Sequence, residues 1–214
     1  MTRLVHCGLL GLVAVSMVGC SDTPTAPSPA PPAVTTVTID FEAVPPPSSP
    51  TEGMVEHRCP YTEDGFTLAT PAGTCGLTGL FVSVHMPPTP MGPYSVNRYT
   101  GSVTLSNAAW YGITRLTRAG GGVFALVSID LDTFNPMSEM FPGGPTDASR
   151  PQTVTFTGTR SDGTTVTQAF TTDTVFPRVE TFRFRADFVD VVKVEWSQLG
   201  PPFHQFDNVV AAFH

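Results

Sequence analysis

The chain has 214 residues, of which only 14% are charged, and its formal net charge is −7. With 11 Lys and Arg against 18 Asp and Glu, it has no basic patch to release counterions from nucleic acid or to hold an anionic lipid surface, so both classes of partner are disfavoured. The 19 glycines and 22 prolines favour strands and turns over helices. The acidic balance is compatible with a bound cation.

The first 19 residues have the layout of a secretory signal. Arg3 supplies the positive start, and an apolar stretch from Leu4 to Gly19 follows it. That stretch is short for a bilayer-spanning helix, which needs about 20 apolar residues. Small Gly19 stands just before Cys20, as cleavage by a signal peptidase requires.

The end of this segment, Met17-Val18-Gly19-Cys20, resembles a bacterial lipobox. The resemblance implies that the Cys20 sulfur is lipidated, that residues 1–19 are removed, and that several acyl chains make a lasting membrane anchor. Ser21 stands where a lipoprotein retained in the inner membrane carries Asp, so the resemblance points to the outer membrane of the cell envelope, with the chain facing either the periplasm or the exterior. An ordinary secretory signal, with Cys20 incidental, is the alternative.

Residues 20–33 read as a tether between this anchor and a folded domain at residues 34–214. The stretch has no apolar surface to bury, and semi-extended proline-rich chain at about 3.1 Å per residue would span roughly 40 Å. Its prolines, which block helices and strand ladders, are Pro24, Pro27, Pro29, Pro31 and Pro32.

After Val34 the chain becomes a series of short runs typical of strands, separated by turn residues. Residues 34–44 (VTTVTIDFEAV) alternate between apolar and polar positions, and Asp162-Gly163 between two Thr-rich runs is a strong hairpin signal. About nine or ten such runs predict an all-β, jelly-roll-like sandwich of two sheets, in which the chain ends lie close together. Trp196 alternates with apolar residues and is expected in the core. Two long loops are predicted, at 45–64 and 86–100.

Two cysteines are expected to form a disulfide in the folded domain. Cys7 leaves with the signal and Cys20 is assigned to the lipid, so Cys59 and Cys75 remain in an exported chain. Their bond would close a loop of about 16 residues, worth on the order of 3 kcal/mol. The alternative, a metal pair, lacks the CxxC spacing.

Several strand motifs carry a family resemblance: TIDFE, DGFTL, LTRAGGGVFALVSIDL, VTFTGTRSDGTTVTQAF and QFDNVV. Together they resemble exported bacterial β-sandwich proteins of a DFE…FDNV pattern and, more distantly, the galactose-binding-like jelly rolls of carbohydrate-binding modules. The resemblance covers most of the chain from Thr38 to Val210. It implies the sandwich fold and, more weakly, sugar binding, because a fold does not dictate a function.

Carbohydrate-binding jelly rolls often hold a structural calcium between their first and last strands. The resemblance implies Asp40, Glu42 and Asp207 as its ligands here, since Asp40 and Glu42 have the i, i+2 spacing of one strand face and calcium prefers hard oxygens. Asp130 and Asp132 form a second aligned pair. Alternatively, these carboxylates are solvated or bonded to nearby backbone.

Aromatic side chains are candidate platforms for a sugar ring, whose C–H groups stack on an electron-rich face. For Trp110 and Tyr111, the alternative is that one packs in the core and the other lies partly exposed at an edge. Polar side chains beside the aromatic ones could bond sugar hydroxyls. The predicted ligand-binding residues are Trp110, Tyr111, Tyr94 and Tyr99, with Asn97 and Arg98.

No motif for nucleophilic, zinc or phosphate chemistry occurs, and only Glu52, Glu56 and His57 form a cluster worth inspecting for hydrolysis. The prediction is therefore a lipid-anchored, non-catalytic binding module of the envelope, for a glycan or another surface polymer. A structural or protein-binding lipoprotein and a hydrolase acting on glycans are the alternatives.

Overall fold

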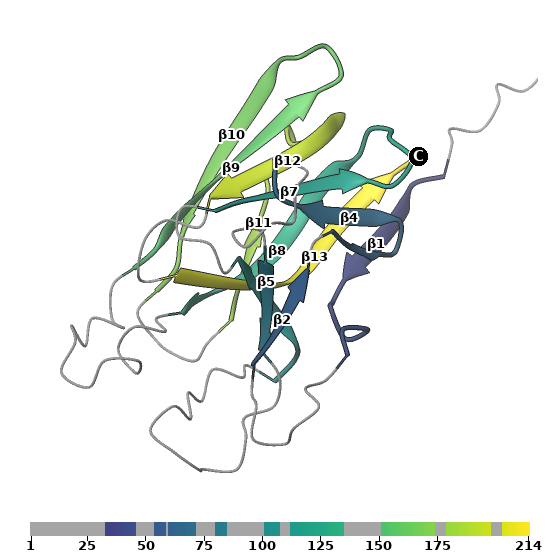
Figure 1. Cartoon of the computed structure of the whole chain (residues 1–214). Coiled ribbons are helices and arrows are strands. Elements are labelled where there is room, and N and C mark those ends of the chain that lie inside the picture. Colours follow the sequence, from purple (N-terminus) through teal and green to yellow (C-terminus); the bar gives the residue numbers. More distant parts are fainter. Residues whose placement is uncertain are drawn as a thin grey trace, which may run out of the picture. The chain divides into compact units, whose positions relative to one another are not determined.

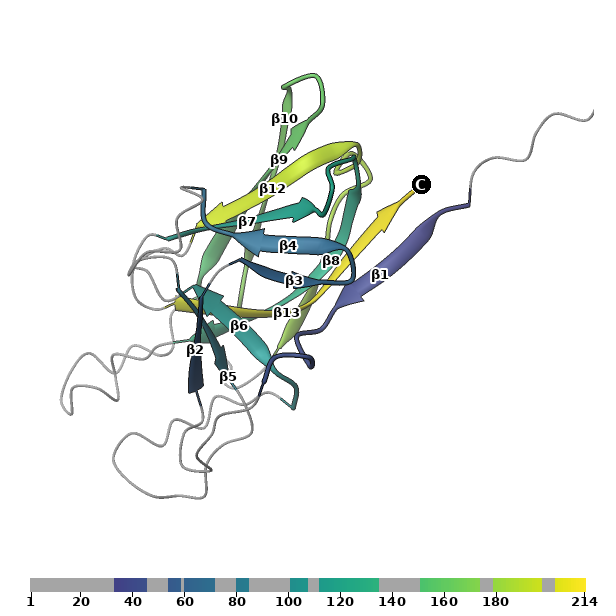
Figure 2. The same cartoon turned by 45° about the vertical axis from the view of Figure 1, so that its right-hand side comes forward.

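The computed structural model describes residues 33–45, 54–58, 60–71, 80–84, 101–107, 112–134, 151–173, 179–197 and 203–214. These residues form thirteen strands in two antiparallel sheets, and they contain no helix (Figures 1 and 2). The all-β, two-sheet prediction is confirmed. Within the same residues, no segment has the helical length and hydropathy of a membrane span.

The first sheet, called sheet A, is built around the longest strand. β13 (Phe203–Phe213) pairs with β8 on one side, and on its other side with β6 through its first half and β1 through its second. The remaining members of sheet A extend it at its two ends. Its other strands are β11 (Glu180–Arg183), β8 (Ala125–Phe134), β6 (Thr104–Asn107), β5 (Leu80–Val84), β2 (Met54–Arg58) and β1 (Thr35–Ile39).

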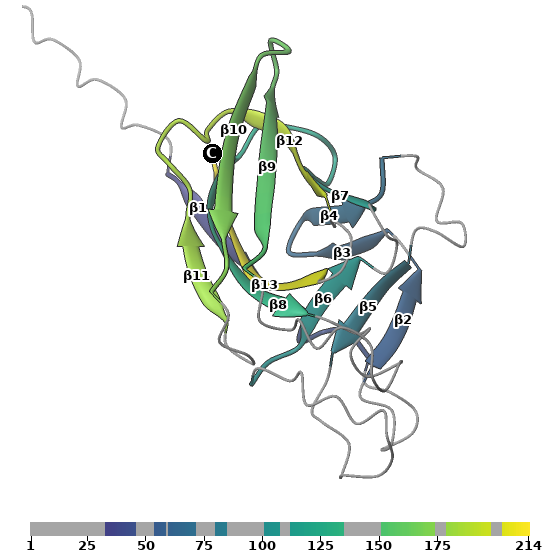
Figure 3. The same cartoon turned by 90° about the vertical axis from the view of Figure 1, so that its left-hand side faces the viewer.

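The second sheet, sheet B, contains the predicted hairpin. Its order is β10 (Thr165–Thr171), β9 (Thr153–Arg160), β12 (Val191–Ser197), β7 (Ile113–Arg118), β4 (Phe66–Ala69) and β3 (Tyr61–Glu63). The turn between β9 and β10, which Figure 3 shows at the far end of the two strands, has Gly163 at a φ of 83°. The Asp-Gly signal is thus confirmed, because only glycine adopts such a φ without strain.

Aromatic rings from both sheets meet in the core. Trp196 of β12 lies edge-on to Phe206 of β13, with ring centroids 5.2 Å apart, and Phe66 of β4 lies 6.0 Å from Phe213 of β13. Edge-to-face pairs of this kind stabilise by about 0.5–1.5 kcal/mol beyond the area they bury. The prediction that Trp196 belongs to the core is confirmed, since its exposed fraction is 2%.

The first and last strands pair with each other, with five residue pairs in register between β1 and β13, which is consistent with the prediction that the chain ends lie close together. The first strand ends earlier than predicted, at Ile39. Phe41 is fully buried but has a φ of 59°, so the chain turns there instead of continuing the alternation. The prediction that Asp40 and Glu42 share a strand face is therefore wrong, because both lie in this turn.

The predicted loop at 45–64 is also wrong, because it contains β2 and β3. β2 pairs with β5 over five residues and β3 pairs with β4 over three. Neither segment alternates clearly in sequence. The partner of β2 is distant in sequence, whereas β3 forms a hairpin with β4 through the turn Asp64-Gly65, where both residues have a positive φ. Such short strands raise the number above the nine or ten expected.

Candidate functional site

Two aspartates face each other across the centre of sheet A. Asp207 of β13 and Asp130 of β8 are directly opposite in the register. Their neighbours Phe206 and Leu131 are buried in the core, so the two carboxylates lie on the other face of the sheet, called here the outer face. Like charges directly opposite each other destabilise a strand pair, so this arrangement needs a compensating interaction.

A β-bulge at Asn208 supplies that interaction. The register shifts between Asp207 and Val210, and Asn208 has a φ of 45°. Its side-chain Nδ2 donates to Asp130 Oδ2 at 2.9 Å and to Asp207 Oδ2 at 3.1 Å, while its backbone N–H donates to Asp207 Oδ1 at 2.7 Å. The bulge thus places one amide between two carboxylates, and bulges commonly re-aim a side chain in this way.

Two further residues complete the group, which we call the aspartate cluster: Asp130, Asp207, Asn208, Ser102 and Glu42. Ser102 Oγ donates to Asp207 Oδ2. Glu42 Oε1 accepts the backbone N–H of Val103 at 2.9 Å, which ties the turn after β1 to the start of β6. Asp207 is 1% exposed, Asp130, Asn208 and Ser102 are half-buried, and Glu42 is exposed. The cluster therefore runs from a buried carboxylate to an accessible one.

Burial, assisted by the nearby charges of Asp130 and Glu42, raises the pKa of Asp207 to about 7. The hydrogen bonds from Ser102 and Asn208 act in the opposite direction but do not compensate. A carboxyl with this pKa exchanges a proton near neutrality, and it is also a group whose charge a bound cation would relieve.

Only part of the predicted calcium triad comes together. The carboxylates of Asp130 and Glu42 act on Asp207, whereas Asp40 Oδ1 accepts the backbone N–H of Glu42 at 3.1 Å within the turn. In the part of the chain that the structure describes, no group of three His, Cys, Asp or Glu side chains is placed to hold a metal ion. The Asn208 amide stands between the two aspartates, so calcium stays a prediction.

A buried polar row adjoins the aspartate cluster on the same outer face. Thr104 Oγ1 donates to Gln205 Oε1 at 2.9 Å, and Gln205 Nε2 donates to Asp132 Oδ2 at 2.9 Å. All three residues are at most 2% exposed. Asp130 and Asp132 thus share a face, as their spacing predicts, and the row links β6, β13 and β8 by side-chain hydrogen bonds.

Sequence reasoning missed Asn208 and Ser102. Two adjacent polar residues, Asp207-Asn208, interrupt the last strand, but they are a weak signal for a bulge, because His204-Gln205 is a second such pair in a regular part of the same strand. Ser102 has no comparable signal, since its contact joins residues 105 positions apart.

Most other predicted site residues lie outside the described part of the chain. His57 is half-buried, and nothing is described of the Glu56 side chain beside it. His204 is buried, and that burial lowers its pKa to about 3, so it is neutral at physiological pH. Outside the described residues are Cys20, Cys59, Cys75, Glu52, Trp110, Tyr111, Tyr94, Tyr99, Asn97 and Arg98.

Comparison with solved structures finds carbohydrate-binding modules. A mutant of a family 29 carbohydrate-binding module is 13% identical with a TM-score of 0.37, over 84% of this chain and 92% of that chain. Another mutant of that module, complexed with mannohexaose, is 13% identical with a TM-score of 0.34, over 84% and 92%. A family 11 module from Clostridium thermocellum, in complex with a mixed-linked tetrasaccharide, is 10% identical with a TM-score of 0.30, over 84% and 96%. No family model and no curated protein matches the chain.

Proposed function

We propose that residues 34–214 form a non-catalytic glycan-binding module, which a lipid on Cys20 and the tether at 20–33 hold at the outer membrane of the bacterial cell envelope. The observation that carries the proposal is the half-buried Asp130–Asn208 pair of the aspartate cluster. The carboxylate of Asp130 and the amide oxygen of Asn208 can accept hydrogen bonds from sugar hydroxyls, whereas the Asn208 Nδ2 group already donates to the two aspartates. Polar groups of this kind fix the orientation of a ligand.

The bulge makes this pair suitable for recognition. Asn208 Nδ2 bonds to both aspartates, and the Asn208 backbone bonds to Asp207, so the side chains are held in place before a ligand arrives. Groups that are already ordered lose little conformational entropy on binding. Exposed Glu42 extends the polar surface, and its bond to Val103 fixes it as well.

Binding to a polysaccharide array tests the proposal. Asn208→Gly is the sharpest variant, because glycine keeps the φ of 45° while removing the amide. Asp130→Ala removes the partner, and Asp187→Ala, at an exposed position on the β11–β12 connection, is the control. We expect one class of glycan to bind the wild type and the control, and to bind the two cluster variants at least tenfold more weakly. Glycan binding that both cluster variants leave unchanged would contradict this assignment.

We also propose that calcium binds at Asp207 after a local rearrangement, since the carboxylates of Asp207, Asp130 and Glu42 are not placed to hold a metal ion as they stand. The support is the raised pKa of Asp207, since a cation would relieve the same repulsion that a proton relieves. Asn208 would have to turn its amide out of the space between the aspartates. We expect a melting temperature that rises with added Ca²⁺ and falls with chelator. An unchanged melting temperature would show that Asp207 takes up a proton but that the cluster binds no calcium.

One observation favours a second function, glycan hydrolysis. Glycosidases use two carboxyl groups, one protonated and one ionised, and Asp207 with a pKa of about 7 stands opposite Asp130. Asp207 is 1% exposed, however, and both its oxygens accept hydrogen bonds, so a substrate has no direct access to it. Release of reducing ends from a bound glycan, abolished in Asp207→Asn, would favour the enzyme over the binding module.

A further inference from the structure

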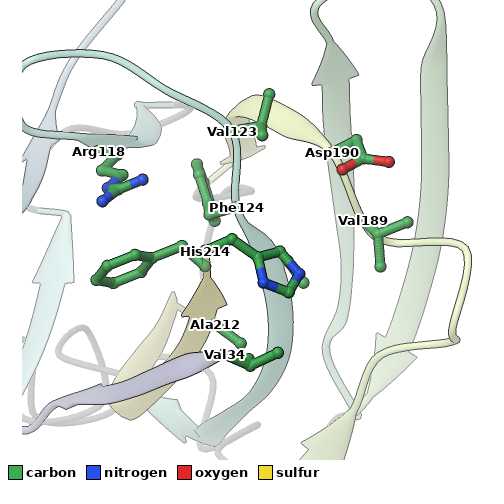
Figure 4. Close-up of a pocket in the computed structure, with 10 residues that line it drawn as sticks. Val34, Arg118, Val123, Phe124, Val189, Asp190, Ala212 and His214 are labelled. Carbon is green, nitrogen blue, oxygen red and sulfur yellow. The ribbon is translucent and has the colours of Figure 1, made fainter. Parts of the chain in front are cut away.

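A pocket away from the aspartate cluster is formed by four stretches of chain that are distant in sequence. It has a volume of about 150 Å³. Val34 before β1, the β7–β8 connection at 118–125, residues 189–190 before β12 and the end of β13 at 212–214 surround it (Figure 4).

The lining of this pocket is largely apolar. Among the described residues, four large hydrophobic side chains are exposed, and three of them line the pocket: Val34 at 59%, Val123 at 39% and Val189 at 39%. Phe124, only 2% exposed, and Phe213 add two aromatic rings. Single exposed hydrophobic residues are ordinary on a protein surface, whereas several gathered around one recess mark a binding site.

One cation is fixed in the wall of the pocket. The guanidinium carbon of Arg118 lies 3.8 Å from the centre of the Phe213 ring, a cation–π contact. Gly122 also lies close to it: a Cβ there would come within 3.3 Å of an Arg118 terminal nitrogen, so the lack of a side chain makes room for the guanidinium. The Phe213 ring and the absence of a side chain at Gly122 thus both accommodate Arg118 in this position.

Arg118 also differs from several cations of the sandwich in its charge partners. Arg115 and Lys193 both pair with Glu195, and Arg185 pairs with Asp187. No carboxylate of the described residues forms an ion pair with Arg118. Figure 4 shows the one acidic side chain of the lining, Asp190, across the pocket from Arg118.

We propose that this pocket binds a small carboxylate attached to an apolar ring, with the ring among the valines and phenylalanines and the carboxylate on Arg118. The size fits, because a cavity of about 150 Å³ lined by apolar side chains accommodates a benzene ring. The charge fits as well, because the planar fork of a guanidinium matches a carboxylate with two parallel hydrogen bonds. This inference does not rest on the proposed glycan function.

An NMR titration of the whole ¹⁵N-labelled chain tests the proposal with three probes. Benzoate carries both ring and charge, benzyl alcohol carries the ring alone, and acetate carries the charge alone. We expect benzoate to shift the backbone amides of Val123, Asp190 and His214 in a saturable way, with a dissociation constant on the order of 1 mM, as suits so small a ligand. Benzyl alcohol and acetate should bind at least tenfold more weakly.

The matched variant is Arg118→Met, whose thioether can still pack on the Phe213 ring while the charge is lost. It should weaken benzoate binding at least tenfold, and Arg183→Met, at an exposed position on β11, should leave it unchanged. The spectrum of each variant before titration reports its fold. The proposal is overturned if benzoate causes no saturable shift, if benzyl alcohol binds as tightly as benzoate, or if Arg118→Met binds benzoate like the wild type. Because glycan binding is assayed separately, its failure and the failure of this proposal remain distinguishable.

Discussion

Asp207→Asn should make the protein more stable above pH 7, although it alters a buried and hydrogen-bonded side chain. In the folded protein the pKa of Asp207 is raised from its ordinary value of 3.8 to about 7. Between about pH 4 and pH 7 the folded state therefore binds a proton that the unfolded state does not, and the free energy of unfolding falls as the pH rises. A pKa difference of this size corresponds to about 4 kcal/mol as an upper limit.

The asparagine variant loses this pH dependence, because an amide does not titrate. It also loses one acceptor, since Asp207 Oδ2 now takes hydrogen bonds from both Ser102 and Asn208. A lost hydrogen bond of this kind costs about 1 kcal/mol. We therefore expect Asp207→Asn to be about 1 kcal/mol less stable than wild type at pH 4 and up to about 3 kcal/mol more stable at pH 8.

Urea unfolding at pH 4, 5.5, 7 and 8, in the presence of a chelator, measures both curves. Asp190→Asn is the control, because Asp190 is exposed and has a φ of 55° that asparagine also adopts readily. The difference between wild type and Asp207→Asn should change sign with pH, and the control should follow the wild type. Parallel curves for wild type and Asp207→Asn from pH 4 to pH 8 would refute the reasoning. If a cation takes the place of the proton, added Ca²⁺ should stabilise the wild type at pH 8 but should not stabilise Asp207→Asn.

Three other changes test the packing and the ion pairs. Gly158→Ala should cost about 1–3 kcal/mol in urea unfolding, because its Cβ would lie 2.8 Å from Val191 Cγ1 inside the core; a stability equal to wild type would show that the core has room. Phe206→Ala removes the ring that packs on Trp196 and should cost about 3–5 kcal/mol, lowering the melting temperature by well over 5 °C. Burial would raise the pKa of Glu195, but hydrogen bonds from Lys193 and Arg115 outweigh it and lower that pKa below its ordinary value of 4.5. Glu195→Gln should therefore be about 1 kcal/mol less stable than wild type at pH 7, and this difference should shrink at a pH well below 4.5, where the carboxylate becomes protonated. An equal loss at both pH values would show that the effect is not electrostatic.

The sequence predicts the sandwich well wherever the signal is local. Alternation identified the first strand and the strand that contains Trp196, and Asp162-Gly163 identified the hairpin, because each signal lies within a few residues. The strand at 54–58 escaped, since its hydrogen bonds come from β5, which is distant in sequence. The strand at 61–63 escaped although Asp64-Gly65 joins it to β4 as a hairpin, a local signal of the same kind as Asp162-Gly163. The early end of the first strand escaped as well, because Phe41 keeps its buried position while its backbone turns.

The candidate site was predicted in part. Asp207 and Glu42 were selected from the sequence, and both belong to the aspartate cluster, while Asp40 turned out to bond within its own turn. Asp130 was recognised only as one of an aligned pair. Its position opposite Asp207 depends on the register between β8 and β13, which no local pattern specifies.

The sequence by itself determined the all-β class, the apolar faces of the main strands and the hairpin, because side-chain alternation and turn chemistry act over short distances. Tertiary structure alone decided which polar residues meet. The one-residue bulge at Asn208 sets the face of each side chain that follows it, and the pocket beside Arg118 exists only where four remote stretches converge. Both depend on strand pairing and packing between residues that are distant in sequence, so no single stretch of the chain can specify them.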